Sequence, residues 1–247
     1  MAATTNTTPA AVVISARNLG KSYNDRPVLA GLDLEITAGE IFALLGPNGA
    51  GKTTAVEILE GYRRADEGEV RVLGVDPVDG GAGFRNRIGI VLQHTTAFEN
   101  FTVAETVDMF AVLYPDPMPV AAAIDLVDLT PQAGQLSAEL SGGQRRRLEV
   151  ACGLVGHPEV LFLDEPTTGL DPEARRRMWE IIAAVKDHGT TVLLTTHYLD
   201  EAEALADRIG ILLGGRLREV ADPTRIGGRS EALATVRYVP HDSGNDG

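Results

Sequence analysis

A loop at residues 46–54 restricts the fold of this chain more than any other feature of its sequence. The loop has the sequence GPNGAGKTT and lies between a short apolar run, EIFALL, and a segment with apolar residues at helical spacing, AVEILEGY. This order predicts a buried strand, a turn and the first residues of a helix. Gly46, Gly49 and Gly51 allow backbone angles that are closed to other residues, and they let a ligand approach the main chain. We therefore expect a strand-to-helix turn that holds a ligand.

The expected ligand of this loop is a phosphate group. Successive N–H groups of such a turn point inward at a helix N-terminus, where unpaired donors and the positive end of the helix dipole attract anions. The spacing fits the pattern G-x-x-x-x-G-K-[ST], which starts at Gly46 and ends at Thr53. In that pattern the lysine, here Lys52, reaches the outer phosphates and the hydroxyl ligates magnesium. A tight turn with chance glycines is the alternative, and it would not require the strand and helix on either side.

Composition limits the classes of function. With 247 residues the chain can bury a core without disulfides or a structural metal. The formal net charge of −13 argues against a broad nucleic-acid-binding surface, because such a surface must be basic. Cys152 is the only cysteine, so it cannot form an intrachain disulfide, and we expect it to pack rather than react. No stretch approaches about 18 consecutive apolar residues, so we expect any membrane role to come through a partner.

Strand-like and helix-like segments alternate along the chain, which indicates an α/β architecture. Eight apolar runs are expected to be strands: VVISARNL, GLDLEI, IFALL, EVRVLG, RIGIVLQ, EVLFLDEP, TTVLLTTH and RIGILLGG. Several are continuous, as in a sheet that is covered on both faces. From about Thr102 to Leu140 no strand is expected, and two segments with helical spacing predict a helical insert. Residues 1–10 and the polar C-terminal end are expected to be disordered.

A strand that ends in two carboxylates supplies a second part of the expected site. Residues 160–166 read VLFLDEP, and ligands of open α/β sheets bind where the strands end. In nucleotide hydrolases with a phosphate-binding loop, the strand-end acid coordinates magnesium, and Asp164 fits that role. Glu165 would then lie beyond the γ-phosphate and polarise an attacking water as a general base. A pair of solvated acids is the alternative for this motif taken alone.

The third motif, LSGGQ at residues 140–144, precedes the helix-like segment RRRLEVACGLV. Ser141 is expected to be the N-cap, and the glycines after it form a second amide-rich helix N-terminus suited to phosphate. A capped helix with a flexible entry is the simpler alternative. Taken together and in this order, GPNGAGKT, LSGGQ and VLFLDEP resemble the ATP-binding subunits of ABC transporters. The resemblance spans about residues 12–220.

The resemblance implies roles for four further residues. Tyr23 matches the aromatic residue that stacks on adenine, and Gln93 matches the glutamine that touches magnesium and relays to the membrane partner. Asp171 in TGLD resembles the loop that crosses the dimer interface, and His197 in LLTTH resembles the histidine that contacts the γ-phosphate. A surface tyrosine and a structural histidine are the ordinary alternatives for such single matches.

These motifs define the complete expected site. Glu165 and His197 are assigned to catalysis, and Thr53, Gln93 and Asp164 are assigned to Mg²⁺. The residues assigned to ATP are Tyr23, Gly46, Pro47, Asn48, Gly49, Ala50, Gly51, Lys52, Thr53, Thr54, Gln93, Ser141, Gly142, Gly143, Gln144 and Asp171. Since none of the key side chains is replaced, we expect an active ATPase.

The resemblance also implies a fold, an assembly and a location. The fold is an α/β P-loop core at residues 11–226, with a small antiparallel β subdomain and a helical subdomain at about 98–140, followed by a short extension at 227–247. Two subunits, identical or paralogous, would bind two ATP molecules head to tail, so that each phosphate-binding loop faces the partner's LSGGQ segment. The helical subdomain would dock on separate transmembrane permease subunits at the cytoplasmic face of the cell membrane. ATP and Mg²⁺ are the implied cofactors, and no nucleic acid partner is expected.

Three segments look like the exporter branch, which includes drug, antibiotic, lipid and polysaccharide efflux subunits of bacteria. They are EGYRRADEGEVRVLGVDP, GGQRRRLEVA and TTHYLDEAEALADRIGILLGGRL. An importer subunit and a soluble ABC ATPase stay as alternatives. Soluble members that act in DNA repair or on chromosomes usually carry long coiled-coil or zinc-binding insertions, and those that act on ribosomes usually have two tandem cassettes. This chain has one cassette with a short insert.

The charged runs have a simple interpretation. Arg145–Arg147 and Arg175–Arg177 are expected to form solvated helix faces, and Trp179 is expected to pack. The acidic segment YLDEAEAL is expected to begin a helix whose dipole it complements.

Overall fold

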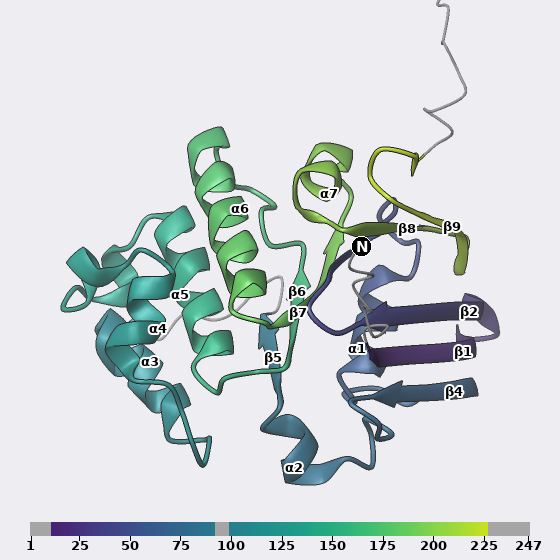
Figure 1. Ribbon diagram of the computed structural model, residues 1–247, viewed down its shortest axis with the longest axis horizontal. Coiled ribbons are helices and arrows are strands. Elements are labelled where there is room, and N and C mark those ends of the chain that lie inside the picture. Colours follow the sequence, from purple (N-terminus) through teal and green to yellow (C-terminus); the bar gives the residue numbers. More distant parts are fainter. Residues whose placement is uncertain (1–10, 92–98, 227–247) are drawn as a thin grey trace, which may run out of the picture.

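The computed structural model of the chain describes residues 11–91 and 99–226. The expected N-terminal tail (1–10), the C-terminal extension (227–247) and Gln93 lie outside the described residues. The described part folds into two β-sheets with α-helices packed against them (Figure 1). None of the described helices is long and apolar enough to cross a membrane.

A three-stranded antiparallel sheet lies on the right in Figure 1. Its order is β2-β1-β4, with strands β1 (Val12–Tyr23), β2 (Arg26–Thr37) and β4 (Glu67–Val72). Asn24 and Asp25 join β1 to β2 with positive φ angles of 48° and 60°, which is the backbone that a two-residue hairpin turn needs. This sheet confirms the small antiparallel β part of the predicted fold.

A six-stranded sheet with the order β5-β6-β7-β3-β8-β9 carries the candidate site. The first five strands are parallel, and β9 is antiparallel to β8. The strands are β3 (Ile41–Leu45), β5 (Ile88–Val91), β6 (Val160–Asp164), β7 (Thr191–Thr196), β8 (Arg208–Leu213) and β9 (Arg216–Ala221). The central strands β6 and β7 are fully buried, which explains why their sequences are continuous apolar runs.

Seven α-helices occur in the described chain, and α3, α4 and α5 gather at the opposite end of the molecule from the small sheet (Figure 1). The helices are α1 (Lys52–Leu59), α2 (Gly81–Arg85), α3 (Val103–Ala111), α4 (Val120–Leu126), α5 (Gly142–Leu154), α6 (Pro172–Asp187) and α7 (Leu199–Leu205). The segment from Thr102 to Leu140 contains helices and no named strand, as the sequence predicted.

Two apolar clusters lie on the two faces of the large sheet. Along β3, Ile41 and Ala43 belong to one cluster and Phe42 and Leu44 to the other, because successive side chains of a strand point to opposite faces. The first cluster continues into α3, α4, α5 and α6, and the second surrounds α1 and underlies the small sheet. Cys152 is buried in the first cluster, where burial raises the pKa of its thiol to about 12. Its predicted packing role is confirmed.

Two short elements, α2 and β9, were not predicted. In β9 exposed and half-buried residues alternate, and the strand pairs with β8 alone, so its sequence RLREVA has no apolar run. The helix α2 is five residues long and buries Phe84. Neither segment is long or apolar enough to give a periodic signal.

Glu60 is an ionisable residue inside the fold. It follows the last residue of α1 and is 8% exposed. Burial first, and then the neighbouring acids Asp164 and Glu57, together raise the pKa of its carboxyl to about 8. The folded protein therefore keeps Glu60 protonated at pH values where an unfolded chain ionises it.

Replacing this acid, Glu60→Gln, is expected to stabilise the protein at high pH. The unfolded chain loses the proton near pH 4.5 and the folded protein near pH 8, so wild-type stability falls as the pH rises through this window. We expect the difference in Tm between the variant and the wild type to be small at about pH 5 and to reach roughly 10 °C at about pH 8. Differential scanning fluorimetry without nucleotide measures it. Glu180→Gln, at an exposed position of α6, is the control, and a pH-independent difference for Glu60→Gln would contradict the assignment.

Candidate functional site

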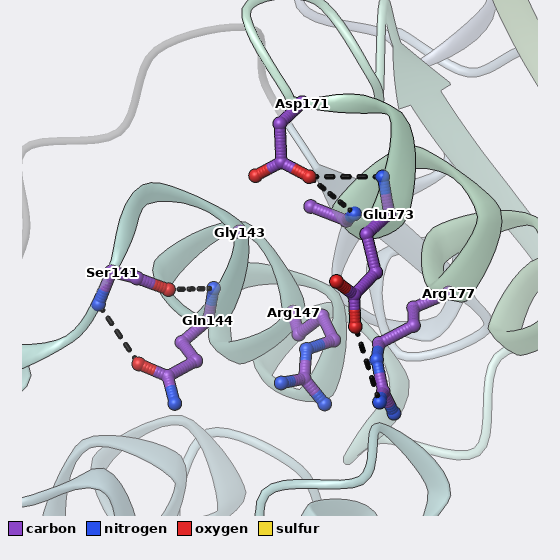
Figure 2. A pocket seen from close by; sticks show the side chains of 8 residues that line it. Ser141, Gly143, Gln144, Arg147, Asp171, Glu173 and Arg177 are labelled. Atoms are coloured by element: carbon purple, nitrogen blue, oxygen red, sulfur yellow. Dashed lines mark hydrogen bonds and ion pairs between the residues drawn. The ribbon is translucent and has the colours of Figure 1, made fainter.

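The candidate residues form two groups at separate places in the described chain. The first surrounds the N-termini of α5 and α6 and lines a pocket of about 170 Å³ (Figure 2). The second lies at the carboxyl ends of β3, β6 and β7, beside a pocket of about 420 Å³. No described residue lines both pockets. One copy of the chain therefore presents two separate candidate pockets.

The LSGGQ segment begins α5 with a reciprocal cap. The Ser141 hydroxyl accepts a hydrogen bond from the Gln144 N–H at 3.2 Å, and Gln144 Oε1 accepts one from the Ser141 N–H at 2.9 Å. This capping box fixes the turn around Gly142 and Gly143. The prediction that Ser141 is an N-cap is confirmed.

Asp171 lies across the same pocket and caps α6 (Figure 2). One of its carboxylate oxygens accepts hydrogen bonds from the N–H groups of Glu173 and Ala174, both at 2.9 Å. Gly143 lets the two helix ends approach, since a Cβ at that position would lie 2.8 Å from Ala174 Cβ. Arg147 and Arg177 complete the lining. The pocket combines the capped N-termini of two helices with two guanidinium groups, which form ion pairs with Asp128, and with the carboxylates of Asp171 and Glu173.

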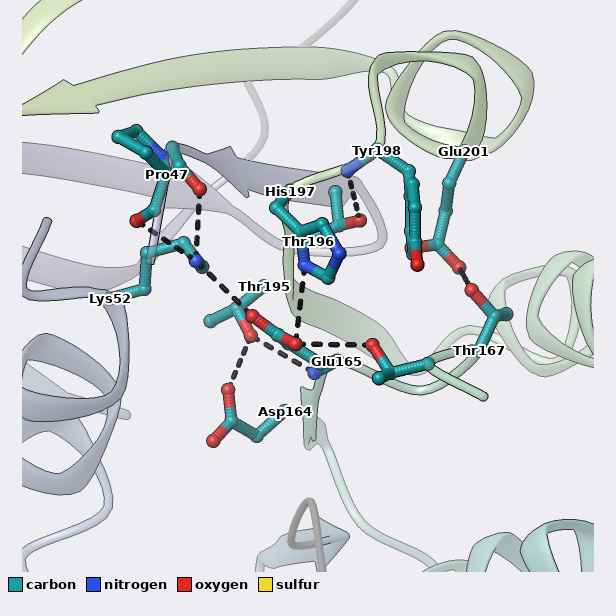
Figure 3. A network of polar contacts seen from close by, with 12 residues as sticks. Pro47, Lys52, Asp164, Glu165, Thr167, Thr195, Thr196, His197, Tyr198 and Glu201 are labelled. Carbon is teal, nitrogen blue, oxygen red and sulfur yellow. Dashed lines mark hydrogen bonds and ion pairs between the residues drawn. The ribbon is translucent and has the colours of Figure 1, made fainter. Parts of the chain in front are cut away.

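In the second group, the sheet order places three candidate segments together. The loop 46–51 follows β3, Asp164 ends β6, and His197 follows β7, which lies between β3 and β6. Because these strands are parallel, their carboxyl ends meet at one edge of the sheet (Figure 3). A Cβ at Gly46 would lie 2.5 Å from the carbonyl oxygen of Leu212. The first glycine of the loop is thus required by the close approach of β8.

Lys52 is buried at the start of α1, with 5% of its surface exposed. Its Nζ donates a hydrogen bond to the Gly46 carbonyl at 2.9 Å and lies 3.2 Å from Glu165 Oε1. The ammonium is therefore held between the loop main chain and the acid that follows β6. A phosphate bound in the loop would compete with Glu165 for this charge.

Asp164 and Thr53 bring oxygen atoms to the base of the loop. Thr53 Oγ1 donates to Asp164 Oδ2 at 3.2 Å, and Thr195 Oγ1 donates a short hydrogen bond to Asp164 Oδ1. A hydroxyl and a carboxylate are ligands that Mg²⁺ prefers, and this ion usually completes its shell with waters and phosphate oxygens. The donor set fits that ion. Among the described residues, no group of three or more His, Cys, Asp or Glu could hold a metal by protein side chains alone.

Glu165 has a left-handed backbone, with φ of 46°, and several contacts hold it. Its N–H donates to Thr195 Oγ1 at 3.0 Å. Its Oε2 accepts from Thr168 Oγ1 at 3.1 Å and lies 3.3 Å from His197 Nδ1. Burial alone would raise the pKa of Glu165, but hydrogen bonds from Lys52 and His197 outweigh it, and the pKa lies below its ordinary value. The carboxylate is therefore ionised at neutral pH, as a general base must be.

Tyr23 lies at the end of β1 and lines neither pocket. The Arg63 guanidinium lies 5.3 Å from the centre of its ring, and Lys21 Nζ lies 5.8 Å from it. Its stacking on adenine stays a prediction. The role of Gln93 also stays a prediction, because that residue lies outside the described part of the chain.

The expectation of solvated arginines at 145–147 was wrong for two of the three. Arg146 and Arg147 are 8% and 9% exposed. Arg146 donates to the carbonyl oxygens of Asp164, at 2.9 Å, and Pro166, at 3.1 Å. The helix period explains the error, since Arg146 and Arg147 lie one turn before the buried Val150 and Ala151. Backbone carbonyls satisfy the buried guanidinium groups.

Arg146 thus clamps the main chain on both sides of Glu165. Arg146→Met should leave two carbonyl oxygens without this donor, which costs roughly 2–3 kcal/mol and lowers Tm by roughly 5–10 °C. Thermal unfolding measures the effect. Arg176→Met, on the exposed face of α6, should change stability by about 0.5 kcal/mol or less. Equal losses in the two variants would show that Arg146 forms no important contact.

Comparison with known proteins identifies the family. The sequence profile of the family described as "ABC transporter" matches residues 29–168. The chain is 43% identical over 202 residues to the daunorubicin resistance ATP-binding protein DrrA3 of Streptomyces coeruleorubidus, covering 80% of this chain and 64% of that protein. It is 42% identical over 213 residues to the Nod factor export ATP-binding protein I of Sinorhizobium fredii, covering 83% and 61%. The chain therefore spans slightly less than two thirds of the length of these relatives.

A solved structure supports the same conclusion. An ATP-binding subunit of an ABC transporter superposes with a TM-score of 0.77 at 25% identity, covering 90% of this chain and 96% of the other. A nucleotide-free ATP-binding cassette, 21% identical with a TM-score of 0.76, covers 86% and 92% and shows the shared fold. Motifs, fold and relatives agree, and the chain belongs to the ABC transporter family, with the fold of its ATP-binding subunits.

Proposed function

We propose that this chain is the ATP-hydrolysing motor subunit of a bacterial exporter. The observation that carries the proposal is the meeting of Lys52, Glu165 and His197 at one edge of the sheet, beside a pocket lined by the phosphate-binding loop. The relatives named for daunorubicin resistance and Nod factor export favour export over import.

The loop and its neighbours would hold Mg-ATP. Main-chain N–H groups of residues 46–54 and the Lys52 ammonium would bind the phosphates, and Tyr23 would stack on the base. Thr53 and Asp164 would hold Mg²⁺, together with Gln93. The ion neutralises charge on the phosphates when it is bound.

Glu165 would orient and deprotonate the attacking water. Its carboxylate is ionised, and it now shares the charge of Lys52. A phosphate that took over Lys52 would leave Glu165 with its Thr168 and His197 contacts, facing the space beyond the γ-phosphate. His197, 26% exposed at its side chain, could reach both Glu165 and that phosphate.

A second subunit would complete the site. The LSGGQ pocket and the phosphate-binding pocket share no described residue, so neither surrounds ATP from all sides. In a head-to-tail pair, Ser141, Gly142, Gly143 and Gln144 of one copy would contact the phosphates held by the other. Asp171 would lie at the interface. ATP then contributes the negative charge that two helix N-termini on opposite subunits attract.

The described chain also offers a place for a membrane partner. A groove of about 680 Å³ runs between the end of α1, α2, β5, α3 and α5, and the buried Glu60 lines it. Tyr62 and Leu113, 79% and 69% exposed, lie in its lining. Exposed apolar residues around a groove mark interaction surfaces. We assign this surface to a transmembrane permease, which would place the subunit peripherally at the cytoplasmic face of the membrane.

Hydrolysis by the purified protein with Mg²⁺ tests the catalytic assignment. Lys52→Ala and Glu165→Gln should each lower kcat at least 100-fold, on the order expected for a lost phosphate contact or general base. Glu165→Gln should still bind ATP, whereas Lys52→Ala should bind it weakly. Lys186→Ala, a lysine paired with Asp207 away from the site, is the control. Hydrolysis by Glu165→Gln at the wild-type rate would remove Glu165 from the mechanism.

The groove assignment is tested in membranes that contain the co-purified partner. Tyr62→Ser and Leu113→Ser should leave basal hydrolysis unchanged and abolish its stimulation by the partner, because the apolar contact is lost. Val220→Ser, another exposed apolar residue, on β9, should keep the stimulation. Full stimulation of both groove variants would place the partner elsewhere, and an active protein with no membrane partner would favour a soluble ATPase.

A further inference from the structure

The buried carboxylate of Glu201 joins three segments next to the candidate site, namely α7, the loop after Glu165 and α6. Glu201 lies in the first turn of α7 and is 1% exposed. Its Oε1 accepts a hydrogen bond from Thr167 Oγ1 at 2.7 Å and another from Trp179 Nε1 at 3.3 Å. Thr167 is fully buried in the loop that follows Glu165, and Trp179 belongs to α6. Figure 3 shows Glu201 reaching from α7 to Thr167, beside the catalytic candidates.

The hydrogen bond between Glu201 and Thr167 connects the two segments that carry Glu165 and His197. Glu165 precedes Thr167 by two residues, and His197 precedes Glu201 by four. The side chains of Glu165 and His197 are 3.3 Å apart, and each lies just beyond the end of a strand, where Glu165 keeps one backbone hydrogen bond to Thr195 of the neighbouring strand. The Thr167–Glu201 hydrogen bond is a second, shorter connection between the same two segments.

The helix α6, which begins at Asp171, is tied to α7 by a further contact. Arg175 forms an ion pair with Asp200 at 3.3 Å, and its guanidinium lies 4.7 Å from the centre of the Tyr198 ring. Glu201 and Arg175 therefore link α7 to α6 from the buried side and from the solvent side. The start of α6, which lines the LSGGQ pocket, is joined to the segment that carries His197.

A purely stabilising role explains Glu201 poorly. Its Oε2 is buried and has no hydrogen-bond partner in the described part of the chain, and a buried acceptor without a donor costs free energy. An apolar side chain would avoid that cost and fill the same space. What an apolar side chain could not do is fix both Thr167 and Trp179 in defined positions.

We propose that Glu201 is a positioning residue that holds Glu165 and His197 in their mutual geometry through Thr167, and joins them to α6 through Trp179. The proposal rests on the catalytic roles proposed above. Its structural part, the ordering of two segments by one carboxylate, can be tested without any ATPase activity.

Hydrogen–deuterium exchange of the nucleotide-free protein tests the structural part. In Glu201→Leu, the backbone amides of residues 164–171 and 196–201 should exchange at least 10-fold faster than in the wild type. Glu201→Gln should restore slow exchange, because its amide oxygen can accept both hydrogen bonds. Ile182→Ala, which opens a cavity at a fully buried position of α6, is the matched control for lost stability. Equal exchange of the two segments in Glu201→Leu and the wild type would overturn the proposal.

Steady-state kinetics well below Tm test the consequence for catalysis. Glu201→Leu should lower kcat about 10-fold or more with little change in KM for ATP, since a displaced base or histidine affects the chemical step. Thr167→Val should reproduce most of this loss, and Glu201→Gln and Ile182→Ala should stay within about 3-fold of the wild type. A Glu201→Leu variant with wild-type kcat, or one whose loss is matched by Ile182→Ala, would overturn the positioning role. An inactive wild type with the expected exchange pattern would instead refute the proposed function.

The single tryptophan of the chain gives an independent signal. Because Trp179 donates to Glu201, its fluorescence emission should shift when Mg-ATP binds to the wild type. The shift should be absent in Glu201→Leu and in Thr167→Val, although both bind ATP. An equal shift in all three proteins would show that Trp179 is not connected to the site through Glu201.

Discussion

The contact between Lys52 and Glu165 is the interaction on which the site depends. It joins the phosphate-binding loop after β3 to the acid after β6 at 3.2 Å, and it can form because β7 alone separates those strands in the sheet. Both side chains are largely buried, so their attraction is screened less than that of a surface pair. A phosphate group that takes Lys52 from Glu165 would change the partners of the base in the same step. In the proposed mechanism, ATP binding and catalysis would thus be linked through one ammonium group.

The rest of the structure holds the two ends of this contact in place. Thr195 of β7 contacts both Asp164 and the Glu165 main chain, and Arg146 of α5 fixes the carbonyls of Asp164 and Pro166. Arg146 lies on α5, five residues after Ser141. The helix that begins at the LSGGQ segment therefore also contacts the main chain on both sides of Glu165. The two pockets, which share no described residue, are therefore joined by direct contacts within one copy of the chain.

Short local patterns predicted the local structure at the candidate site better than composition or charge did. Three elements depend only on residues that are neighbours in the sequence, so the sequence alone was sufficient to predict them. They are the loop at 46–54, the strand that ends at Asp164 and the cap at Ser141. The burial of Arg146 and Arg147 depends on which face of α5 packs against the rest of the protein. A run of three arginines does not indicate which face that is. The roles of Thr195 and Thr167 depend on strand order, which no local pattern encodes. The edge strand β9 was missed because a half-exposed strand carries little apolar signal.

In the proposed assembly, two copies of the chain, or this chain and a paralogue, complete each ATP site between them. The most direct test is the molar mass of Glu165→Gln, measured by light scattering after gel filtration, with and without Mg-ATP. We expect a monomer without nucleotide and a stable dimer with Mg-ATP, because ATP would supply the charge that joins the phosphate-binding loop of one copy to the LSGGQ segment of the other. A protein that binds Mg-ATP at saturation and stays monomeric would contradict it.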